Sequence, residues 1–256
     1  MKFVVIGGTG LIGSKVVSRL REHGHEVVVA APSTGIDILT GEGLDTAMAG
    51  TDIVIDLANS PTFQGDAPME FFRTAGRNIL GAEARAGVGH HLALSVVGTE
   101  RLSSSEYFRA KLAQEQLIVA SGIPYTIVHS TQFFEFLPSI IQAGAEGDTV
   151  RLPSALVQPI AAEDVADAVT RLASGPPANA IVEIAGPERE PMSDLARRFL
   201  GITQDPRKVV GDAQARYFGA ELQNDTLVPA QKGWQGRLNL ELWLAQSEHA
   251  QHAARA

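Results

Sequence analysis

The first 130 residues alternate between short, continuous apolar runs and longer segments with helical spacing of their apolar side chains. The runs lie at residues 2–8, 25–31, 51–59, 90–98 and 124–130. Such runs are typical of strands that are buried on both faces of a parallel sheet. The helical segments lie at residues 10–25, 42–50, 68–86 and 104–121. The pattern therefore predicts an α/β fold, a doubly wound parallel sheet with helices on both faces.

The regularity weakens after residue 132. The pattern there predicts helices at 131–147 and 191–201, strands near 149–153 and 179–187, and a strand that leads into a helix at 157–174. No internal repeat or low-complexity linker separates this part from the rest. We therefore predict a single domain over residues 1–256, in which residues about 132–150 and 186–256 contribute a small C-terminal substrate lobe.

Composition narrows the classes of partner. The net charge is −8 and no run is rich in lysine or arginine, which argues against a nucleic-acid partner. The chain has no cysteine, which excludes disulfides and thiol chemistry and fits a reducing compartment. No apolar run reaches the roughly 18 residues of a membrane span, and the start "MKFVVIGGTG" is unlike a signal peptide. The sequence thus predicts a cytoplasmic protein without a membrane partner.

A glycine-rich turn, "GGTGLIG", follows the first strand and opens the first helix. Gly8, Gly10 and Gly13 match the pattern G-x-G-x-x-G. Gly7, Gly10 and Gly13 match the related pattern G-x-x-G-x-x-G. Glycines at this spacing let the backbone approach a pyrophosphate, and the helix then points its first N–H groups at that anion. The strand–turn–helix context favours a dinucleotide site over a tight turn without a ligand. Its predicted cofactor contacts are Gly7, Gly10, Leu11, Ile12 and Gly13.

The end of the second strand bears on the choice of dinucleotide. NAD-selective sites usually have an acidic residue about 20 residues after the glycines, but "VVVAAPSTG" has none. Ser33 and Thr34 can hydrogen-bond a 2′-phosphate, although no lysine or arginine accompanies them. We therefore predict NADP(H) in preference to NAD(H). Asp37 either lies beside the adenine or caps a turn, and Ala58, Asn59 and Lys111 are further predicted cofactor contacts.

Taken together, "GGTGLIG", "LSVVG" at 94–98 and "YFRAK" at 107–111 resemble the short-chain dehydrogenase/reductase superfamily. The glycine spacing and "SGIPYTIVHSTQFFEF" at 121–136 are most similar to its atypical, NmrA-like branch. "QPIAAEDVADAV" at 158–169 extends the likeness, which covers at least residues 1–170. The resemblance implies a Rossmann fold that binds NAD(P).

The same resemblance implies a catalytic serine, tyrosine and lysine, which correspond to Ser95, Tyr107 and Lys111. Lys111 would lie near the Tyr107 hydroxyl and the nicotinamide ribose, where its charge would lower the pKa of the tyrosine. Tyr107 would then exchange a proton with the substrate, while Ser95 would hydrogen-bond the same oxygen. Spacing alone leaves a second interpretation open, because residues four apart are neighbours on any helix.

Three further residues are predicted to contact the substrate. His129 ends a strand, and ligands in such sheets gather beyond the carboxyl ends of the strands. With Gln132 and Phe133 it is predicted to line a substrate or nicotinamide pocket. The alternative is a histidine at a strand end whose hydrogen bonds are satisfied by its neighbours. His90 and His91 are adjacent in a strand and so face opposite sides of the sheet. No histidine, aspartate or glutamate cluster has metal-ligand spacing, and no metal site is predicted.

These observations predict an NAD(P)H-dependent oxidoreductase that acts on a carbonyl, enone or alcohol group of a small organic molecule. The first alternative is an NADP(H)-binding redox sensor that passes its state to a protein partner. The second is an isomerase or lyase that retains its cofactor. The prediction allows for a homodimer. A sensor does not need Tyr107, so this residue discriminates between the enzyme and the sensor.

Overall fold

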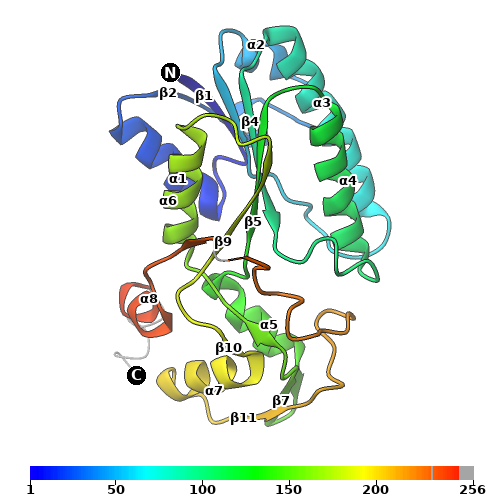
Figure 1. The fold of residues 1–256 in the computed structure, drawn as a ribbon, viewed down its shortest axis with the longest axis vertical. Coiled ribbons are helices and arrows are strands. Elements are labelled where there is room, and N and C mark those ends of the chain that lie inside the picture. The colour runs from blue at the N-terminus through cyan, green and yellow to red at the C-terminus, as the bar shows by residue number, and fades with distance from the viewer. Residues whose placement is uncertain (232, 248–256) are drawn as a thin grey trace. The chain divides into compact units, whose positions relative to one another are not determined.

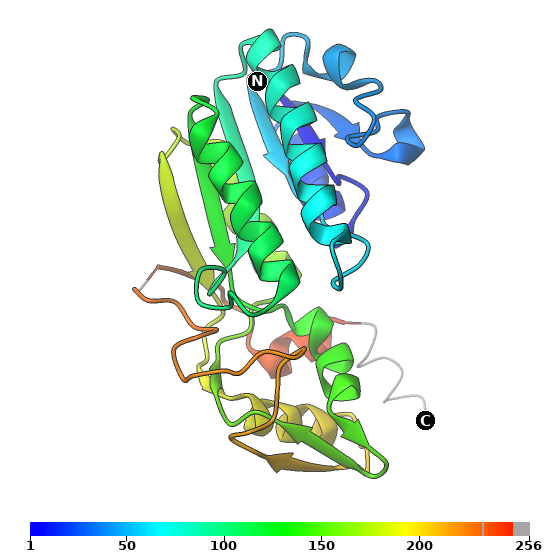
Figure 2. The same cartoon turned by 90° about the vertical axis from the view of Figure 1, so that its right-hand side faces the viewer.

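The computed structural model describes residues 1–231 and 233–247. The chain forms two compact units: Met1–His129 with Val165–Val182, and Ser130–Asp164 with Glu183–Ala256. The second unit thus contains both segments that were predicted to form a lobe, together with residues 151–164. Figures 1 and 2 show the course of the chain through each unit.

A seven-stranded parallel sheet has the strand order β12-β9-β5-β4-β3-β1-β2, which confirms the predicted fold class. The strands are β1 (Lys2–Ile6), β2 (Glu26–Ala30), β3 (Ile53–Asp56), β4 (His90–Val96), β5 (Tyr125–Ser130), β9 (Ala180–Ala185) and β12 (Trp234–Gln235). The chain runs from β1 to β2 on one side and then crosses to β3 on the other. The carboxyl ends of β1 and β3 therefore border the point where the strand order reverses, and ligands bind there in sheets of this kind.

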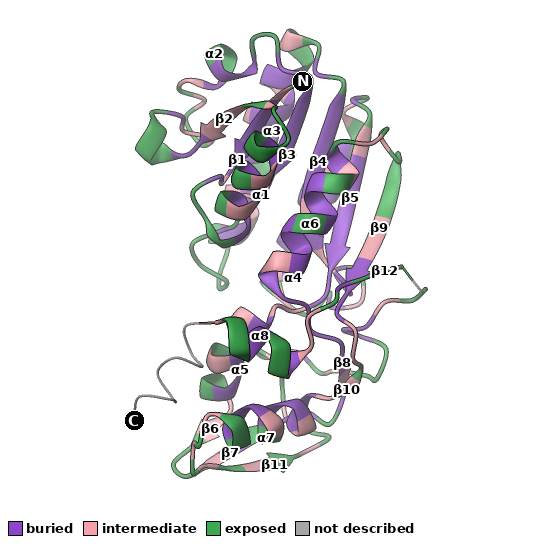
Figure 3. Cartoon of the chain, turned by 90° about the vertical axis from the view of Figure 1, so that its left-hand side faces the viewer, coloured by how far each residue is buried: buried purple, intermediate pink, exposed green. Residues whose placement is uncertain are grey.

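Helices cover both faces of the sheet in the first unit (Figure 1). The helices α3 (Ala67–Ala86) and α4 (Glu106–Ala120) lie on one face, and α1 (Leu11–Glu22) and α6 (Ala162–Ala173) lie on the other. The short α2 (Leu44–Met48) and a 3₁₀ turn, η1 (Pro32–Thr34), lie in connections. Because both faces are covered, the central strands are buried along nearly their whole length (Figure 3).

The core of the first unit follows from the apolar spacing. Beneath α3, Ala75 and Ile79 pack with Val4, Ile6 and Val54 of the neighbouring strands in one buried cluster. A second cluster joins α3 and α4 to β4 and β5 through Leu80, Ala93, Ile118 and Ile127. Both helices are thereby fixed against the strands whose carboxyl ends carry the candidate site.

The second unit is built from shorter elements. It contains a three-stranded sheet of order β11-β7-β6 and a two-stranded sheet of order β10-β8. The strands are β6 (Ala145–Glu146), β7 (Thr149–Leu152), β8 (Leu156–Val157), β10 (Glu190–Pro191) and β11 (Lys208–Gly211). Its helical elements are η2 (Phe134–Phe136), α5 (Leu137–Ala143), α7 (Met192–Ile202) and α8 (Leu240–Gln246).

The helix predicted over residues 131–147 is much shorter in the structure, because α5 covers only Leu137–Ala143. Pro138 lies in the first turn, where its missing N–H costs no hydrogen bond. Gly144 ends the helix, and a Cβ there would lie 2.4 Å from the carbonyl oxygen of Arg151. The return of the chain towards β7 therefore stops the helix.

Two carboxylates fix the chain around α8. Asp164 Oδ2 accepts the backbone N–H groups of Arg237 and Leu238, both at 2.9 Å. Glu135 accepts the backbone N–H of Ala162 and the indole N–H of Trp243, the latter at 2.9 Å. Two acidic residues thus hold the segment that leads into α8 and α8 itself.

Replacement of Asp164 by alanine leaves two backbone N–H groups without their charged acceptor. We expect the free energy of unfolding to fall by roughly 2–4 kcal/mol. Asp167→Ala, on the same helix, is the control: its side chain is 57% exposed and pairs with Arg19, so the loss should be about 1 kcal/mol or less. Urea unfolding followed by circular dichroism measures both, and equal losses would contradict this role of Asp164.

Candidate active site

The glycine turn begins directly after β1. Gly7 has a φ of +71°, and its N–H donates to the Ala30 carbonyl at 2.9 Å. The N–H of Gly10 donates back to the Gly7 carbonyl at 2.9 Å and closes the turn. A Cβ on Gly13 would lie 2.1 Å from the same oxygen, so no other residue fits there without a shift of the backbone. The positions of Gly7 and Gly13 are therefore required by the turn itself.

The start of α1 is the candidate anion site. Gly10 precedes the helix and supplies no side-chain cap, and the first turn has no acidic residue. The first N–H groups of a helix have no partner within the helix, which here concerns Leu11, Ile12 and Gly13. The five residues predicted to contact the pyrophosphate are thus together at one helix N-terminus, the arrangement that binds such a group.

The turn after β2 has no acidic residue. Ser33 is exposed in η1. The Thr34 hydroxyl lies 2.8 Å from the carbonyl oxygens of Val29 and Ala31, so it already has hydrogen-bond acceptors in the neighbouring backbone. Asp37 Oδ1 accepts the N–H groups of Leu39 at 2.7 Å and Thr40 at 3.3 Å. Asp37 therefore caps a turn, and its contact with the adenine stays a prediction.

The loop after β3 brings Tyr107 towards the glycine turn. A Cβ on Gly7 would lie 3.0 Å from the carbonyl oxygen of Leu57, so this loop contacts the turn. Ala58 follows, with its N–H bonded to Asp56 Oδ1 at 3.0 Å. The side chain of the next residue, Asn59, accepts the Tyr107 hydroxyl at 3.0 Å. Only one residue, Ala58, therefore separates the contact with the glycine turn from the partner of Tyr107.

Burial sets the ionisation of Tyr107. The ring is covered by Phe63, with centroids 5.0 Å apart, and by Phe72, with centroids 6.2 Å apart. Burial raises the pKa of Tyr107 to about 12. The predicted lowering of this pKa is therefore wrong, and the tyrosine is a protonated group at neutral pH.

Lys111 does not lower the pKa of Tyr107, because its ammonium group is bonded to other residues. Its ammonium group donates to the Leu94 carbonyl at 2.9 Å and to Gln114 Oε1 at 2.6 Å, and not to Tyr107. It also lies 4.7 Å from the centroid of Phe72, the ring that contacts Tyr107. Burial lowers the pKa of Lys111 to about 8, against the opposing effect of Asp56 and Glu115.

Gln114 extends this arrangement into a network. Its side-chain N–H₂ group donates to Asp56 Oδ2 at 2.9 Å, so a lysine, an amide and a carboxylate connect α4 to the carboxyl end of β3. Asp56, Lys111 and Gln114 are all buried. Every charge in the network has a hydrogen-bonded partner, as the cost of burying ions requires.

Ser95 belongs to a different group of side chains. Its hydroxyl donates to Glu115 Oε1, and His129 Nε2 lies 3.0 Å from the same oxygen. All three residues are at least nine-tenths buried. The structure thus brings the predicted catalytic Ser95 together with the predicted substrate residue His129, and it does not join Ser95 to Tyr107.

Three residues of these networks were missed by the sequence reasoning: Asp56, Gln114 and Glu115. The sequence pattern of α4 could have indicated Gln114 and Glu115, because positions 107, 111, 114 and 115 lie on one face of the helix and all carry polar side chains. Three of the residues at these positions, Lys111, Gln114 and Glu115, are buried in the structure. A polar face on a helix that packs against a sheet indicates partners in that sheet.

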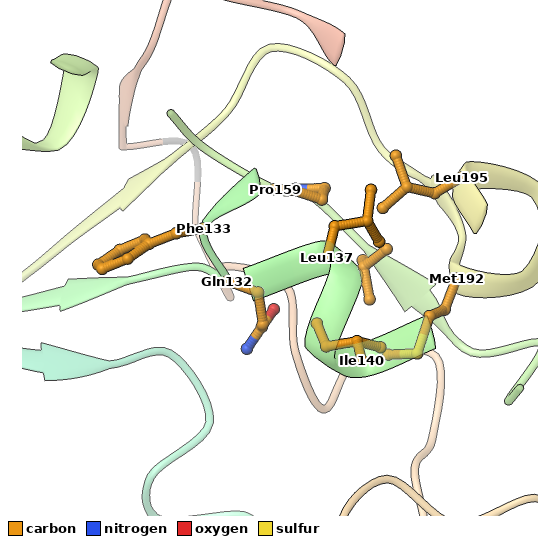
Figure 4. A pocket seen from close by; sticks show the side chains of 8 residues that line it. Gln132, Phe133, Leu137, Ile140, Pro159, Met192 and Leu195 are labelled. Atoms are coloured by element: carbon orange, nitrogen blue, oxygen red, sulfur yellow. The ribbon is translucent and has the colours of Figure 1, made fainter. Parts of the chain in front are cut away.

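Gln132 and Phe133 lie in the second unit, whereas His129 lies in the first. Gln132 and Phe133 line an apolar pocket together with residues of α5 and α7 (Figure 4).

The adjacent histidines of β4 have separate partners. The ring of His90 contacts Thr126 at 2.9 Å and that of His91 contacts Glu83 at 2.8 Å, so the two histidines do not act together. Residues 1–231 and 233–247 include no group of three or more histidine, aspartate or glutamate residues able to hold a metal ion.

Comparisons with known proteins identify a family and a fold. A family model described as NAD(P)H-binding matches residues 7–176. A curated relative, the photosystem II assembly factor Ycf39 of Cyanophora paradoxa, is 23% identical over 151 residues, which are 54% of this chain and 47% of that protein. The match thus spans about half the length of this relative. Within the described part of the chain, no helix is long and apolar enough to cross a membrane.

Solved structures share the fold over nearly the whole chain. DesIV, a dTDP-glucose 4,6-dehydratase from Streptomyces venezuelae solved with NAD, has a TM-score of 0.76 and 15% identity, covering 98% of this chain and 97% of that one. The dTDP-4-dehydrorhamnose reductase of Bacillus anthracis, solved with NADP, has a TM-score of 0.66 and 15% identity, covering 84% and 87%. At these identities the likeness concerns the fold.

Gly13→Ala tests the glycine turn. The added Cβ collides with the Gly7 carbonyl, so we expect a loss of roughly 1–3 kcal/mol of stability and at least tenfold weaker binding of NADPH and NADH. Gly201→Ala is the matched control, because nothing lies within 4 Å of its Cβ position. Thermal unfolding and calorimetric titration measure both effects, and unchanged dinucleotide affinity in Gly13→Ala would contradict the assignment.

The pKa of Lys111 predicts a pH dependence of stability. Between its folded value of about 8 and the ordinary value of 10.5, the unfolded chain holds a proton that the folded chain has lost. The free energy of unfolding from this group therefore rises with pH, by roughly 2 kcal/mol between about pH 8 and pH 10. Lys111→Met should lack this rise, and Lys208→Met, at an exposed position, should retain it. Urea unfolding at several pH values measures the free energy of unfolding. If this free energy changed with pH in the same way in wild type and Lys111→Met, the prediction would be refuted.

Proposed function

The chain belongs to the NAD(P)H-binding family, and on that premise we propose that it is an NAD(P)H-dependent oxidoreductase of the short-chain dehydrogenase/reductase type. Its substrate is a small organic molecule with a carbonyl, enone or alcohol group. The likeness to this Rossmann superfamily is shown by the family model and by the solved structures. The NmrA-like branch stays a prediction.

One observation supports the proposal most directly. The Tyr107 hydroxyl is hydrogen-bonded to Asn59, two residues from the carbonyl that contacts Gly7. A dinucleotide whose pyrophosphate lies at this turn extends over the carboxyl ends of the strands, where Asn59 and Tyr107 are. The proposal therefore requires the nicotinamide half to reach Tyr107.

In the proposed reaction, Tyr107 is the proton donor. Its pKa of about 12 keeps the hydroxyl protonated at neutral pH, so it can donate to a carbonyl oxygen during reduction. The bound cofactor supplies the hydride. Asn59 has an acceptor oxygen and an N–H₂ donor group, so the same side chain can hold the hydroxyl before transfer or the phenolate after it. Lys111 provides a buried positive charge beside Phe72.

We further propose a preference for NADP(H). It is supported by the absence of an acidic side chain at the end of β2 and by the exposed Ser33. An acidic residue there would repel a 2′-phosphate and bind a 2′-hydroxyl instead. Proteins of the same fold have been solved with NADP and with NAD, so the preference rests on these residues of the chain.

A second candidate function is a non-catalytic NADP(H) sensor. The raised pKa of Tyr107 and the engagement of Lys111 with Gln114 favour it, because neither residue is arranged as an activated pair. The curated relative is described as an assembly factor, which also fits a binding role. A retained-cofactor lyase is a further alternative, given the dehydratase among proteins of this fold.

Tyr107→Phe separates these functions. For the oxidoreductase we expect unchanged NADPH affinity and a loss of roughly 10²–10⁴ in kcat with small ketones and enones, because the proton donor is removed. Tyr125→Phe, at a half-buried position at the start of β5, is the matched control and should keep its activity. Consumption of NADPH measures the rate. Full activity in Tyr107→Phe, or tight NADPH binding without turnover of any substrate by wild type, would overturn the proposal.

A further inference from the structure

The side chain of Asp56, at the carboxyl end of β3, is hydrogen-bonded in two directions. Its Oδ1 accepts the backbone N–H of Ala58 at 3.0 Å, and its Oδ2 accepts the side-chain N–H₂ group of Gln114 at 2.9 Å. Asp56 is buried, with only 3% of the residue exposed. It thus joins two segments that are far apart in the sequence, the loop after β3 and the helix α4.

The bond to Ala58 fixes the loop that carries the partner of Tyr107. An aspartate that accepts the N–H two residues further on closes a local turn. Ala58 follows Leu57, whose carbonyl oxygen lies against the glycine turn, and precedes Asn59. Asn59 in turn accepts the Tyr107 hydroxyl at 3.0 Å. The position of this hydroxyl therefore depends on a loop that Asp56 holds.

The bond to Gln114 determines which way the amide of Gln114 points. An ionised carboxylate has only acceptors, whereas an amide side chain has a donor end and an acceptor end. Because the N–H₂ end donates to Asp56, the oxygen is turned towards Lys111, whose ammonium group donates to it at 2.6 Å. An ammonium group has donors only, so the opposite orientation of the amide would place donors against donors. Asp56 therefore sets the amide orientation that Lys111 requires.

We propose that Asp56 is a positioning residue of the reaction at Tyr107. One of its oxygens fixes the loop that carries Asn59, the partner of the tyrosine hydroxyl. The other orients the Gln114 amide, which holds the ammonium group of Lys111 on the helix that also carries the tyrosine. This inference rests on the proposed function, since it assigns a further residue to that reaction.

Glu115 does not share this role. Asp56 and Glu115 both act on the pKa of Lys111, which they raise against the effect of burial. The carboxylate of Glu115, however, accepts the Ser95 hydroxyl and lies 3.0 Å from His129 Nε2. The chain of hydrogen bonds that starts at the ammonium group runs through an amide to Asp56 instead.

An exchange of carboxylate and amide between positions 56 and 114 tests this role. In Asp56→Asn, an N–H₂ group replaces one oxygen, so either the bond to Ala58 or the bond that orients Gln114 is lost. In the double variant Asp56→Asn/Gln114→Glu, the new carboxylate accepts both the asparagine N–H₂ group and the Lys111 ammonium. The asparagine oxygen then accepts the Ala58 N–H, and the shape and net charge of wild type are kept.

NMR of ¹⁵N-labelled lysine ammonium groups observes Lys111 in the whole chain. The chain has five lysines, so the signals are few, and Lys111→Met assigns this one. At about pH 6 the group is protonated, because its pKa is about 8, and a buried, hydrogen-bonded ammonium exchanges its protons slowly. We expect its signal in wild type, its loss in Asp56→Asn and its return in the double variant.

Asp164→Asn is the matched control, because Asp164 is also buried and also accepts backbone N–H groups. The Lys111 signal should persist in this variant. A Lys111 signal that persists in Asp56→Asn, or that stays absent in the double variant, would overturn the proposal. If Asp56→Asn does not fold, Gln114→Met replaces it, since only the orienting amide is removed and the bond to Ala58 stays. Retention of the signal in Gln114→Met would overturn the proposal equally.

Kinetics give a second measure of the same role. Displacement of a group beside the reacting atoms lowers the rate, so kcat of Asp56→Asn for small ketones and enones should fall roughly tenfold. We expect recovery to within about twofold of wild type in the double variant, because a hydrogen bond restored in kind restores the geometry. A kcat that stays low in the double variant would contradict the positioning role.

The NMR measurement needs no turnover, so the two proposals can fail separately. The expected pattern of the Lys111 signal, without reduction of any carbonyl compound by wild type, would contradict the oxidoreductase and leave the orientation of Lys111 by Asp56 standing. Reduction at the wild-type rate by Asp56→Asn, with an unchanged Lys111 signal, would overturn the role of Asp56 and leave the oxidoreductase standing.

Discussion

The close contact between the Gly13 backbone and the carbonyl of Gly7 is the constraint on which the site depends. There is no room for a side chain at this contact, because a Cβ on Gly13 would lie 2.1 Å from that oxygen. The contact holds the start of α1 against the end of β1 and directs the first helical N–H groups out of the turn. On its other side, the Gly7 backbone meets Leu57 of the loop after β3. One tight turn thereby places the start of α1 next to the loop that holds Tyr107.

The buried face of α4 is the second determinant of the site. Most helices of this fold present apolar residues to the sheet, but α4 presents Lys111, Gln114 and Glu115. Burying such groups is costly unless each has a partner, and here each is hydrogen-bonded to a strand end or to another network member. The arrangement favours a protonated Tyr107 and a lysine of lowered pKa. It therefore fixes which groups can give or take a proton near neutral pH.

Much of the first unit could be predicted from the sequence, because buried parallel strands and their helices leave distinct apolar patterns. The glycine spacing also predicted the tight turn at Gly7, Gly10 and Gly13. The partners of Ser95 and Lys111 could not be predicted, because helical spacing identifies a shared face and not the side chains opposite it. The prediction that the pKa of Tyr107 is lowered was wrong for the same reason. The short α5 shows a further limit, since the apolar spacing does not predict the β6–β7 hairpin that brings Arg151 back to Gly144.

The central claim is that a dinucleotide held by the glycine turn reaches Tyr107. The chain has three tyrosines, so NMR of ¹³C-labelled tyrosine rings during titration with NADP⁺ tests the claim directly. We expect the Tyr107 signal to shift on binding and the signal of Tyr125, at the amino end of β5, to stay unchanged. Saturable binding of NADP⁺ that leaves the Tyr107 signal unchanged would contradict it.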